Sequence, residues 1–277
     1  MKNEAFNWTT DDGLSIYAKD WKVAAPTAVI GLVHGMGEHI NRYNHLAAFF
    51  NKKNFAVVGF DQRGHGQSEG QRGHAPNLQI LLDSISELLV EIEIRYPDLP
   101  VFLYGHSMGG GIVLNYVLRR HPTIQGAVVT SPWIDLAFSP SSGRVMLGKL
   151  MRILYPKYSE SSNLETQYLA HDLQVVKDYV ADPLVHDQIT AAMAMGMIDG
   201  GKWLLNYHNT VKIPLLIMHA GDDQITSPRA SEQLAKQLNG DVTFKKWAGL
   251  YHEIHNEAQQ EEIFRFTYNW MSDRVTD

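Results

Sequence analysis

Continuous apolar runs alternate with helically spaced apolar positions along the first half of the chain. Runs typical of strands buried on both faces of a sheet occur at 28–33, 55–60, 101–105 and 126–130. Apolar positions with helical spacing occur between these runs, at 45–53, 77–96 and 111–120. Because strands and helices alternate, the pattern predicts an α/β protein with a mostly parallel central sheet flanked by helices.

Both ends of the chain extend this sheet. Near the N-terminus, residues 6–9 and 14–18 flank Asp11-Asp12-Gly13, which is a hairpin signal. Near the C-terminus, residues 213–219 and 242–247 are predicted to form two more strands. Helical spacing at 228–238 and 257–272 predicts the last two helices.

The alternation is interrupted between residues 133 and 211. Helical patterns such as 145–154 and 188–207 occur there without a strand run between them. We interpret about 134–211 as a helical cap insertion within one domain of residues 1–277, lying over the carboxyl ends of the strands, where open α/β sheets bind ligands. Its apolar side chains either anchor it to the body or line a pocket for alkyl chains, and the second role suits three methionines at alternate positions: Met193, Met195 and Met197.

Composition and charge exclude several classes of function. A net charge of −6 without a basic block argues against a nucleic-acid partner. The absence of cysteine excludes disulfides, thiolate catalysis and zinc–thiolate sites. The N-terminal residues do not resemble a secretory signal, and there is no run of about 18 apolar residues. We therefore expect a cytoplasmic protein, with peripheral membrane contact through the cap left open and no expectation for the oligomeric state.

The segment Gly105-His106-Ser107-Met108-Gly109 is typical of a nucleophile elbow. It joins a predicted strand to a predicted helix, and it has the Gly-x-Ser-x-Gly form that presents a serine at a strained turn. Glycine lacks a Cβ, so two glycines let such a corner close. The alternative is an ordinary glycine-rich turn between a strand and a helix.

A serine nucleophile requires a histidine base and a carboxylate that orients the histidine. Behind an elbow serine, the acid and then the histidine are expected in loops after late strands. Asp223 follows the strand at 213–219, and His252 follows the strand at 242–247. The predicted triad is therefore Ser107, Asp223 and His252.

Three other acidic residues are alternatives to Asp223. Asp222 is the main competitor because it is adjacent in the same loop. Asp135 also follows a predicted strand, but that strand comes one strand earlier in the chain, at the start of the insertion. Asp61 precedes the serine in the sequence, so it is expected to cap its turn beside Arg63.

The oxyanion of an acyl-transfer reaction needs two N–H donors. One is expected from the backbone of Met108, directly after the nucleophile, and the other from the loop after the first buried strand, at Met36. The side chain of His106 is expected to point away from the reaction centre. The histidines lack a zinc-type carboxylate pattern, so neither a metal nor a cofactor is expected.

Six segments together resemble the monoacylglycerol lipase and lysophospholipase branch of the α/β-hydrolase family, which is grouped with serine aminopeptidase S33-like enzymes. The resemblance covers about residues 6–270 and rests on the following motifs: His34-Gly35-Met36-Gly37-Glu38-His39 with Arg42-Tyr43, Asp61-x-Arg63-Gly64-His65-Gly66-x-Ser68-x-Gly70, Gly105–Gly110, Asp182–Val185, Asp223, and Tyr251-His252-x-x-His255. It implies the α/β-hydrolase fold and supports the triad and both oxyanion donors.

The resemblance also implies a lipid ester substrate. In that family a glutamate, an arginine and a second histidine hold the glycerol head group, and the matching positions are Glu38, Arg42 and His255. From spacing alone, Glu38 and Arg42 would form only a local ion pair. We expect hydrolysis of monoacylglycerols; the alternatives are a lysophospholipase, a serine aminopeptidase or other carboxylesterase, and a catalytically silent binding or scaffold protein.

Overall fold

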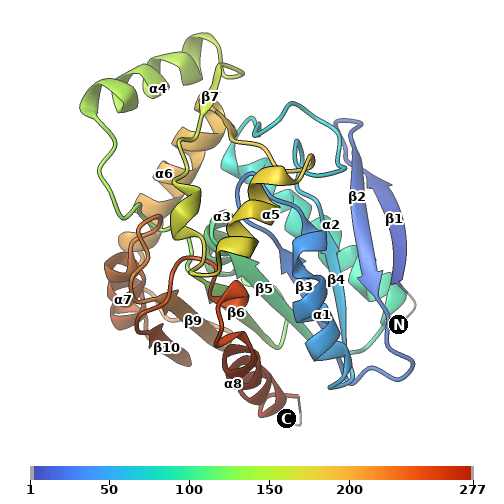
Figure 1. Ribbon diagram of the computed structural model, residues 1–277. Coiled ribbons are helices and arrows are strands. Elements are labelled where there is room, and N and C mark those ends of the chain that lie inside the picture. The colour runs from blue at the N-terminus through green and yellow to red at the C-terminus, as the bar shows by residue number, and fades with distance from the viewer. Residues whose placement is uncertain (1–2, 276–277) are drawn as a thin grey trace.

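A computed structural model describes residues 3–275 (Figure 1). The centre of the fold is one eight-stranded sheet. The strand order is β1-β2-β4-β3-β5-β6-β9-β10. The strands are β1 (Asn3–Thr9), β2 (Ser15–Trp21), β3 (Ala28–Val33), β4 (Phe55–Phe60), β5 (Val101–His106), β6 (Gly126–Thr130), β9 (Leu215–Ala220) and β10 (Val242–Trp247). Neighbours from β4 to β10 are parallel, and β2 is antiparallel to β1 and β4. The prediction of a mostly parallel sheet with an N-terminal hairpin is confirmed.

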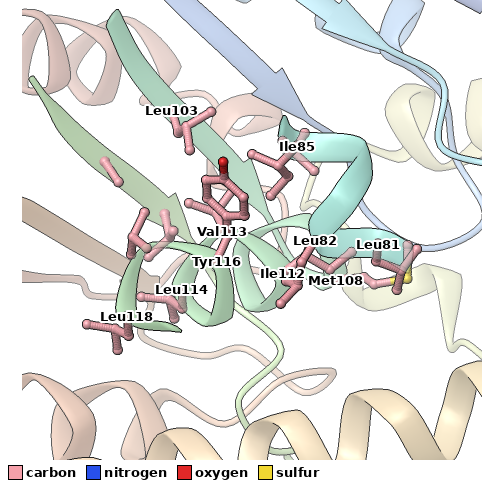
Figure 2. Close-up of a cluster of buried hydrophobic side chains, with 14 of the residues drawn as sticks. Leu81, Leu82, Ile85, Leu103, Met108, Ile112, Val113, Leu114, Tyr116 and Leu118 are labelled. Carbon is pink, nitrogen blue, oxygen red and sulfur yellow. The ribbon is translucent and has the colours of Figure 1, made fainter. Parts of the chain in front are cut away.

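Helices cover both faces of the sheet. On one face lie α1 (Asn44–Asn51) and α8 (Gln260–Ser272), and on the other α2 (Leu78–Arg95), α3 (Met108–Arg120) and α7 (Pro228–Gln237). Successive strand side chains point to opposite faces, so Val29 packs in the α2–α3 cluster and Ile30 packs in the α1–α8 cluster. Figure 2 shows the contact of α2 with α3, where Leu82 lies beside Ile112 and Ile85 lies nearer to Tyr116.

The parallel order brings distant loops to one edge of the sheet. The loops after β3, β5, β9 and β10 all leave the carboxyl ends of parallel strands. They carry residues 34–39, Ser107, Asp223 and His252 respectively. The sheet therefore gathers residues as far apart in the sequence as His34 and His252 at a single edge.

The cap segment, residues 131–214 between β6 and β9, contains both expected helices and a small sheet. Its elements are α4 (Ser142–Leu154), β7 (Ser159–Ser161), the 3-10 turn η2 (Thr166–Tyr168), α5 (Leu173–Ala181), β8 (Gln188–Thr190) and α6 (Ala191–Leu205). No strand run is visible in the sequence of this segment, but β7 and β8 pair antiparallel. Three-residue strands are too short to show an alternating pattern.

The three methionines of α6 divide between two environments. Met193 and Met197 are one helical turn apart, on the same face, and both are buried in the core. Met195 lies on the other face and contacts Gly148 of α4. In a helix, residues four apart share a face and residues two apart do not. Met195 therefore cannot share the face of Met193 and Met197.

Two further short 3-10 turns, η1 (Ile40–Tyr43) and η3 (Ile254–Asn256), follow the loops at the carboxyl edge. Within residues 3–275, no helix combines the length and the apolar character that crossing a bilayer requires.

Candidate active site

Ser107 occupies a strained corner between β5 and α3. Its φ of 53° and ψ of −117° lie outside the regions that ordinary residues prefer. A Cβ on Gly105 would lie 2.7 Å from the carbonyl oxygen of Gly109, and a Cβ on Gly109 would lie 2.2 Å from that of Val33. Both positions therefore require glycine, and the corner holds Ser107 at the N-terminus of α3.

Ser107, His252 and Asp223 form a continuous hydrogen-bonded chain. The Ser107 Oγ lies 2.8 Å from Nε2 of His252, and Nδ1 of His252 lies 2.7 Å from Oδ2 of Asp223. All three side chains are buried. The order serine, acid, histidine places each group in the loop that the sequence indicated, and the geometry suits proton transfer from Ser107 to His252.

Asp223 has a full set of hydrogen-bond donors. Its Oδ1 accepts from the backbone N–H groups of Ile225 (2.8 Å) and Thr226 (3.0 Å). Its Oδ2 accepts from the Thr226 hydroxyl (3.0 Å) and from the His219 ring (3.1 Å) as well as from His252. Sequence reasoning did not single out Thr226 or His219, although His219 ends a buried strand four residues before the acid.

The other acidic residues lie elsewhere. Asp222 is exposed, and only its backbone is tied to the histidine loop, through Leu250. Asp135 is exposed and accepts from the adjacent N–H group of Leu136. Asp61 accepts from the N–H groups of Ile40 and Gln67, so it caps its turn as expected.

The charge of Asp223 controls the basicity of His252. Burial alone would lower the pKa of His252, but the neighbouring Asp223 carboxylate outweighs burial and holds that pKa above the ordinary 6.5. Burial would raise the pKa of Asp223, and its contacts with His252 and His219 instead hold that pKa well below the usual range. Asp223 is therefore ionised wherever His252 titrates.

Met36 and Met108 are the residues whose backbone N–H groups are predicted to bind the oxyanion. Met36 lines the cavity above Ser107, together with Gly35. Met108 is the first residue of α3, where backbone N–H groups have no partner within the helix, and its side chain is buried in the core. That their backbone N–H groups bind the oxyanion stays a prediction.

A cavity of about 330 Å³ opens above Ser107 and His252. Its walls come largely from the cap segment and are mainly apolar, with Trp133, Leu136, Leu147, Ile189, Met195 and Ile198 among them. Of the three methionines of α6, Met195 lines the cavity. Such a cavity suits an alkyl chain whose reacting end meets the serine.

Glu38 lies beside the nucleophile at the polar end of the cavity. A Cβ on Gly35 would lie 2.7 Å from Oε1 of Glu38 and 3.3 Å from Cβ of Ser107, so the two side chains lie close together. Glu38 accepts from the Gly35 N–H group and the Tyr43 hydroxyl, both at 2.7 Å, and from Arg42 at 2.6 Å. The local ion pair that spacing indicates is therefore present.

Arg42 and His255 are not among the described residues that line the cavity. Arg42 is held between Glu38 and a second carboxylate, Glu253. His255 is fully buried and stacks on Tyr43, with ring centroids 4.8 Å apart. Burial lowers the pKa of His255 to about 3, so its ring is neutral at physiological pH.

The expectation for His106 is wrong. Its ring lies 4.8 Å from the ring of His252 and 4.6 Å from that of His255, and it borders the cavity. Its Nδ1 is 3.0 Å from the Thr130 hydroxyl. Strand alternation alone does not reveal that the histidine loop folds back over the end of β5. Among residues 3–275, no group of three or more His, Cys, Asp or Glu side chains is arranged to hold a metal ion.

A family model described as serine aminopeptidase, S33, matches residues 24–259. The chain belongs to this family. Its architecture is the α/β-hydrolase fold, as the resemblance implied. The family assignment fits the elbow serine and the order of the loops at the carboxyl edge.

Individual proteins are similar over most or nearly all of the chain. A Monoacylglycerol lipase of Mycolicibacterium smegmatis is 32% identical over 89% of this chain and 88% of its own length. The crystal structure of Paleococcus ferrophilus monoacylglycerol lipase superimposes with a TM-score of 0.86 at 32% identity, covering 94% of this chain and 99% of that one. An uncharacterized abhydrolase domain-containing protein of Dictyostelium discoideum is 36% identical over 99% of this chain, which spans only 30% of that protein's length.

Proposed function

We propose that this protein is a serine hydrolase that cleaves monoacylglycerols into a fatty acid and glycerol. One observation carries the proposal: the Ser107–His252–Asp223 chain opens on an apolar cavity, with the acceptor Glu38 beside the serine. The apolar wall suits an acyl chain, and the carboxylate suits the hydroxyls of a glyceryl group. Two similar proteins that carry the name monoacylglycerol lipase support the same substrate class.

The proposed reaction has two halves. The Ser107 Oγ attacks the ester carbonyl while His252 Nε2 takes its proton, and the tetrahedral intermediate collapses as His252 passes that proton to the glyceryl oxygen. Glycerol leaves an acyl-enzyme on Ser107. Water then attacks the acyl group, His252 takes a proton from the water and returns it to Ser107, and the fatty acid departs. Asp223 orients His252 and stabilises its positive charge in both halves.

The backbone N–H groups of Met36 and Met108 are the proposed oxyanion donors. Glu38 is the proposed contact to the head group, because it lines the cavity. Arg42 and His255 support that end of the site from positions outside the cavity lining: Arg42 holds Glu38, and His255 packs against Tyr43, whose hydroxyl also bonds Glu38.

The test is Ser107→Ala against a panel of a medium-chain monoacylglycerol, a lysophospholipid and an aminoacyl anilide. The unchanged protein is expected to have its highest kcat/KM on the monoacylglycerol. Ser107→Ala should lose turnover by a factor on the order of 10⁶ and lose labelling by a fluorophosphonate. Ser142→Ala, at an exposed serine on α4, is the matched control and should keep both. Undiminished hydrolysis by Ser107→Ala would refute the mechanism, and a higher kcat/KM on either other substrate would refute the assignment of substrate.

We also propose that α4 docks on a lipid surface. None of its side chains is buried, and Met146, Ile153 and Leu154 are 72%, 79% and 67% exposed. In Figure 1, α4 stands apart from the sheet at the outer end of the cap segment. Residues 136–159 contain four basic and no acidic residues; of the four, Arg144 and Arg152 pair with Glu160 and Asp199, and the other two are Lys149 and Lys157. Exposed apolar residues together with basic ones are typical of a helix that lies in a membrane interface.

A further inference from the structure

Glu253 is a second buried carboxylate at the polar end of the cavity. It directly follows His252, is 2% exposed, and lines the same cavity as Ser107 and Glu38. Its Oε1 and Oε2 accept from the two terminal nitrogens of Arg42, each at 2.7 Å. Asn256 donates a further hydrogen bond to Oε2 at 2.7 Å. This two-pronged pairing fixes the orientation of the Glu253 carboxylate.

One nitrogen of Arg42 brings the two carboxylates together. Nη1 lies 2.6 Å from Oε2 of Glu38 and 2.7 Å from Oε1 of Glu253. Because both oxygens contact the same atom, they are near neighbours. Each of these two oxygens has a single hydrogen-bond donor, Arg42, within the described part of the chain, although a carboxylate oxygen can accept from two. Two adjacent acceptors therefore retain capacity for hydroxyl donors.

This cluster carries no excess of positive charge. Burial would raise the pKa of the Glu253 carboxyl, but Arg42 outweighs burial and holds that pKa well below its usual range, so Glu253 is ionised. Burial, partly offset by Arg42, raises the pKa of Glu38. The cluster contains two carboxyl groups and one guanidinium group, so it supplies acceptors and has no excess of positive charge that could bind a phosphate.

We propose that Glu253 and Glu38 together accept hydrogen bonds from the two free hydroxyls of a glyceryl ester. Arg42 is the residue that positions both carboxylates. This inference rests on the proposed function and assigns the head-group specificity to a residue that the family resemblance did not indicate. A glyceryl group donates two hydroxyl hydrogens to the paired oxygens, whereas the ethyl ester of the same acid has none to donate. An anionic head group is disfavoured by both carboxylates.

The experiment compares the glyceryl and ethyl esters of one medium-chain fatty acid, in the same detergent micelles. The quantity measured is the ratio of their kcat/KM values. Glu253→Gln is expected to lower this ratio roughly 10- to 100-fold, because the variant loses a charged acceptor for a hydroxyl. Glu253→Asp, which keeps the charge at shorter reach, should recover part of the ratio.

Glu257 provides the matched control. It is buried in the same loop, where it accepts from the Tyr251 N–H group and the His171 ring, each at 2.8 Å, and it is outside the described cavity lining. Glu257→Gln should change the hydrolysis of both esters by the same factor, because its role is structural. An unchanged rate of fluorophosphonate labelling reports that Ser107 and His252 remain in place in each variant.

The outcomes separate this inference from the proposed function. If the unchanged protein does not prefer the glyceryl ester, the proposed substrate is wrong. If it does prefer that ester and Glu253→Gln keeps the full preference, only the role of Glu253 is wrong. A second measurement needs no variant: a 1-O-alkylglycerol should inhibit ethyl-ester hydrolysis at least about tenfold more tightly than its 3-phosphate. Equal or tighter inhibition by the phosphate would overturn the inference.

Discussion

At the scale of single residues, Asp223 determines how the proposed base behaves. Its two oxygens receive hydrogen bonds from two backbone N–H groups, the Thr226 hydroxyl and the His219 ring, so the carboxylate has one orientation toward His252. These bonds favour the charged form of the acid, and that charge in turn favours the protonated form of His252.

A pH profile tests this coupling. The base must be neutral to accept the proton of Ser107, and the pKa of His252 is raised above 6.5. Activity should therefore be low while His252 is protonated and should rise as the pH passes that raised pKa. Asp223→Asn removes the charge, so the rise should move to lower pH while kcat falls roughly 10⁴-fold, as it does when a triad carboxylate is lost elsewhere. The pH dependence of kcat/KM on a soluble ester gives both quantities. An unmoved rise in Asp223→Asn would show that another group sets the profile.

The sequence predicted the proposed catalytic residues better than their surroundings. Ser107, Asp223 and His252 are recognisable because each follows a strand in a fixed order. His219 and Thr226 carry no such pattern, and neither does Glu253. Their contacts depend on how the loops after β9 and β10 fold over one another, which the spacing of residues along one chain does not encode.

At the scale of elements, α3, which begins with Met108, packs closely on the end of β3, which leads into the loop that contains Met36. Gly109→Ala would place a Cβ 2.2 Å from the carbonyl oxygen of Val33 and 2.4 Å from that of His34. Both are backbone atoms, so α3 must move away from the loop that contains Met36. We expect a loss of about 1–3 kcal/mol in the free energy of unfolding. We also expect a fall in kcat of roughly 10²-fold, since one oxyanion donor is displaced.

The control for this substitution is Gly143→Ala on α4. No atom lies within 4 Å of a Cβ at Gly143, and the residue is exposed. Alanine favours a helix over glycine by about 1 kcal/mol, so this variant should be as stable as the unchanged protein or slightly more stable. Denaturant unfolding and turnover of a soluble ester provide the comparison. If Gly109→Ala behaves like Gly143→Ala, the close packing of α3 on β3 is not needed for the reaction.

The inner strands β3, β4, β5, β6 and β9 could be predicted because each is a mainly apolar segment that is buried in the sheet. The elements of the cap segment could be predicted only in part. The patterns for α4 and α6 are visible in the sequence, although the predicted 188–207 helix merged β8 with α6. Pairing of β7 with β8 is a contact between segments nearly thirty residues apart, and neither is long enough to show a period. The assignment of Met193 and Met197 to the core and of Met195 to the cavity follows from helical geometry once the helix is known.

At the scale of the whole molecule, the apolar face of α4 and the cavity belong to the same segment. Leu147 of α4 lines the cavity, while Met146 beside it is exposed to solvent. A monoacylglycerol is itself an amphiphile that gathers in membranes and micelles. A helix that contacts both the lipid surface and the cavity would shorten the path of the substrate from the bilayer to Ser107.

The double variant Met146→Ser, Ile153→Ser tests this arrangement, with Val90→Ser, Ile94→Ser on α2 as the control. The control side chains are also largely exposed, at 58% and 68%, but they lie on a helix of the central body. Fully burying a large apolar side chain contributes about 1.5–3 kcal/mol, so losing two partly inserted side chains should weaken binding to anionic vesicles roughly 10- to 100-fold. The same variant should hydrolyse a soluble short-chain ester normally and vesicle-bound monoacylglycerol more slowly, because only access to the bilayer has changed.

Equal sedimentation of the two double variants with vesicles would exclude α4 as the docking element. A matching loss on the soluble ester would show instead that the substitutions disturb the cavity.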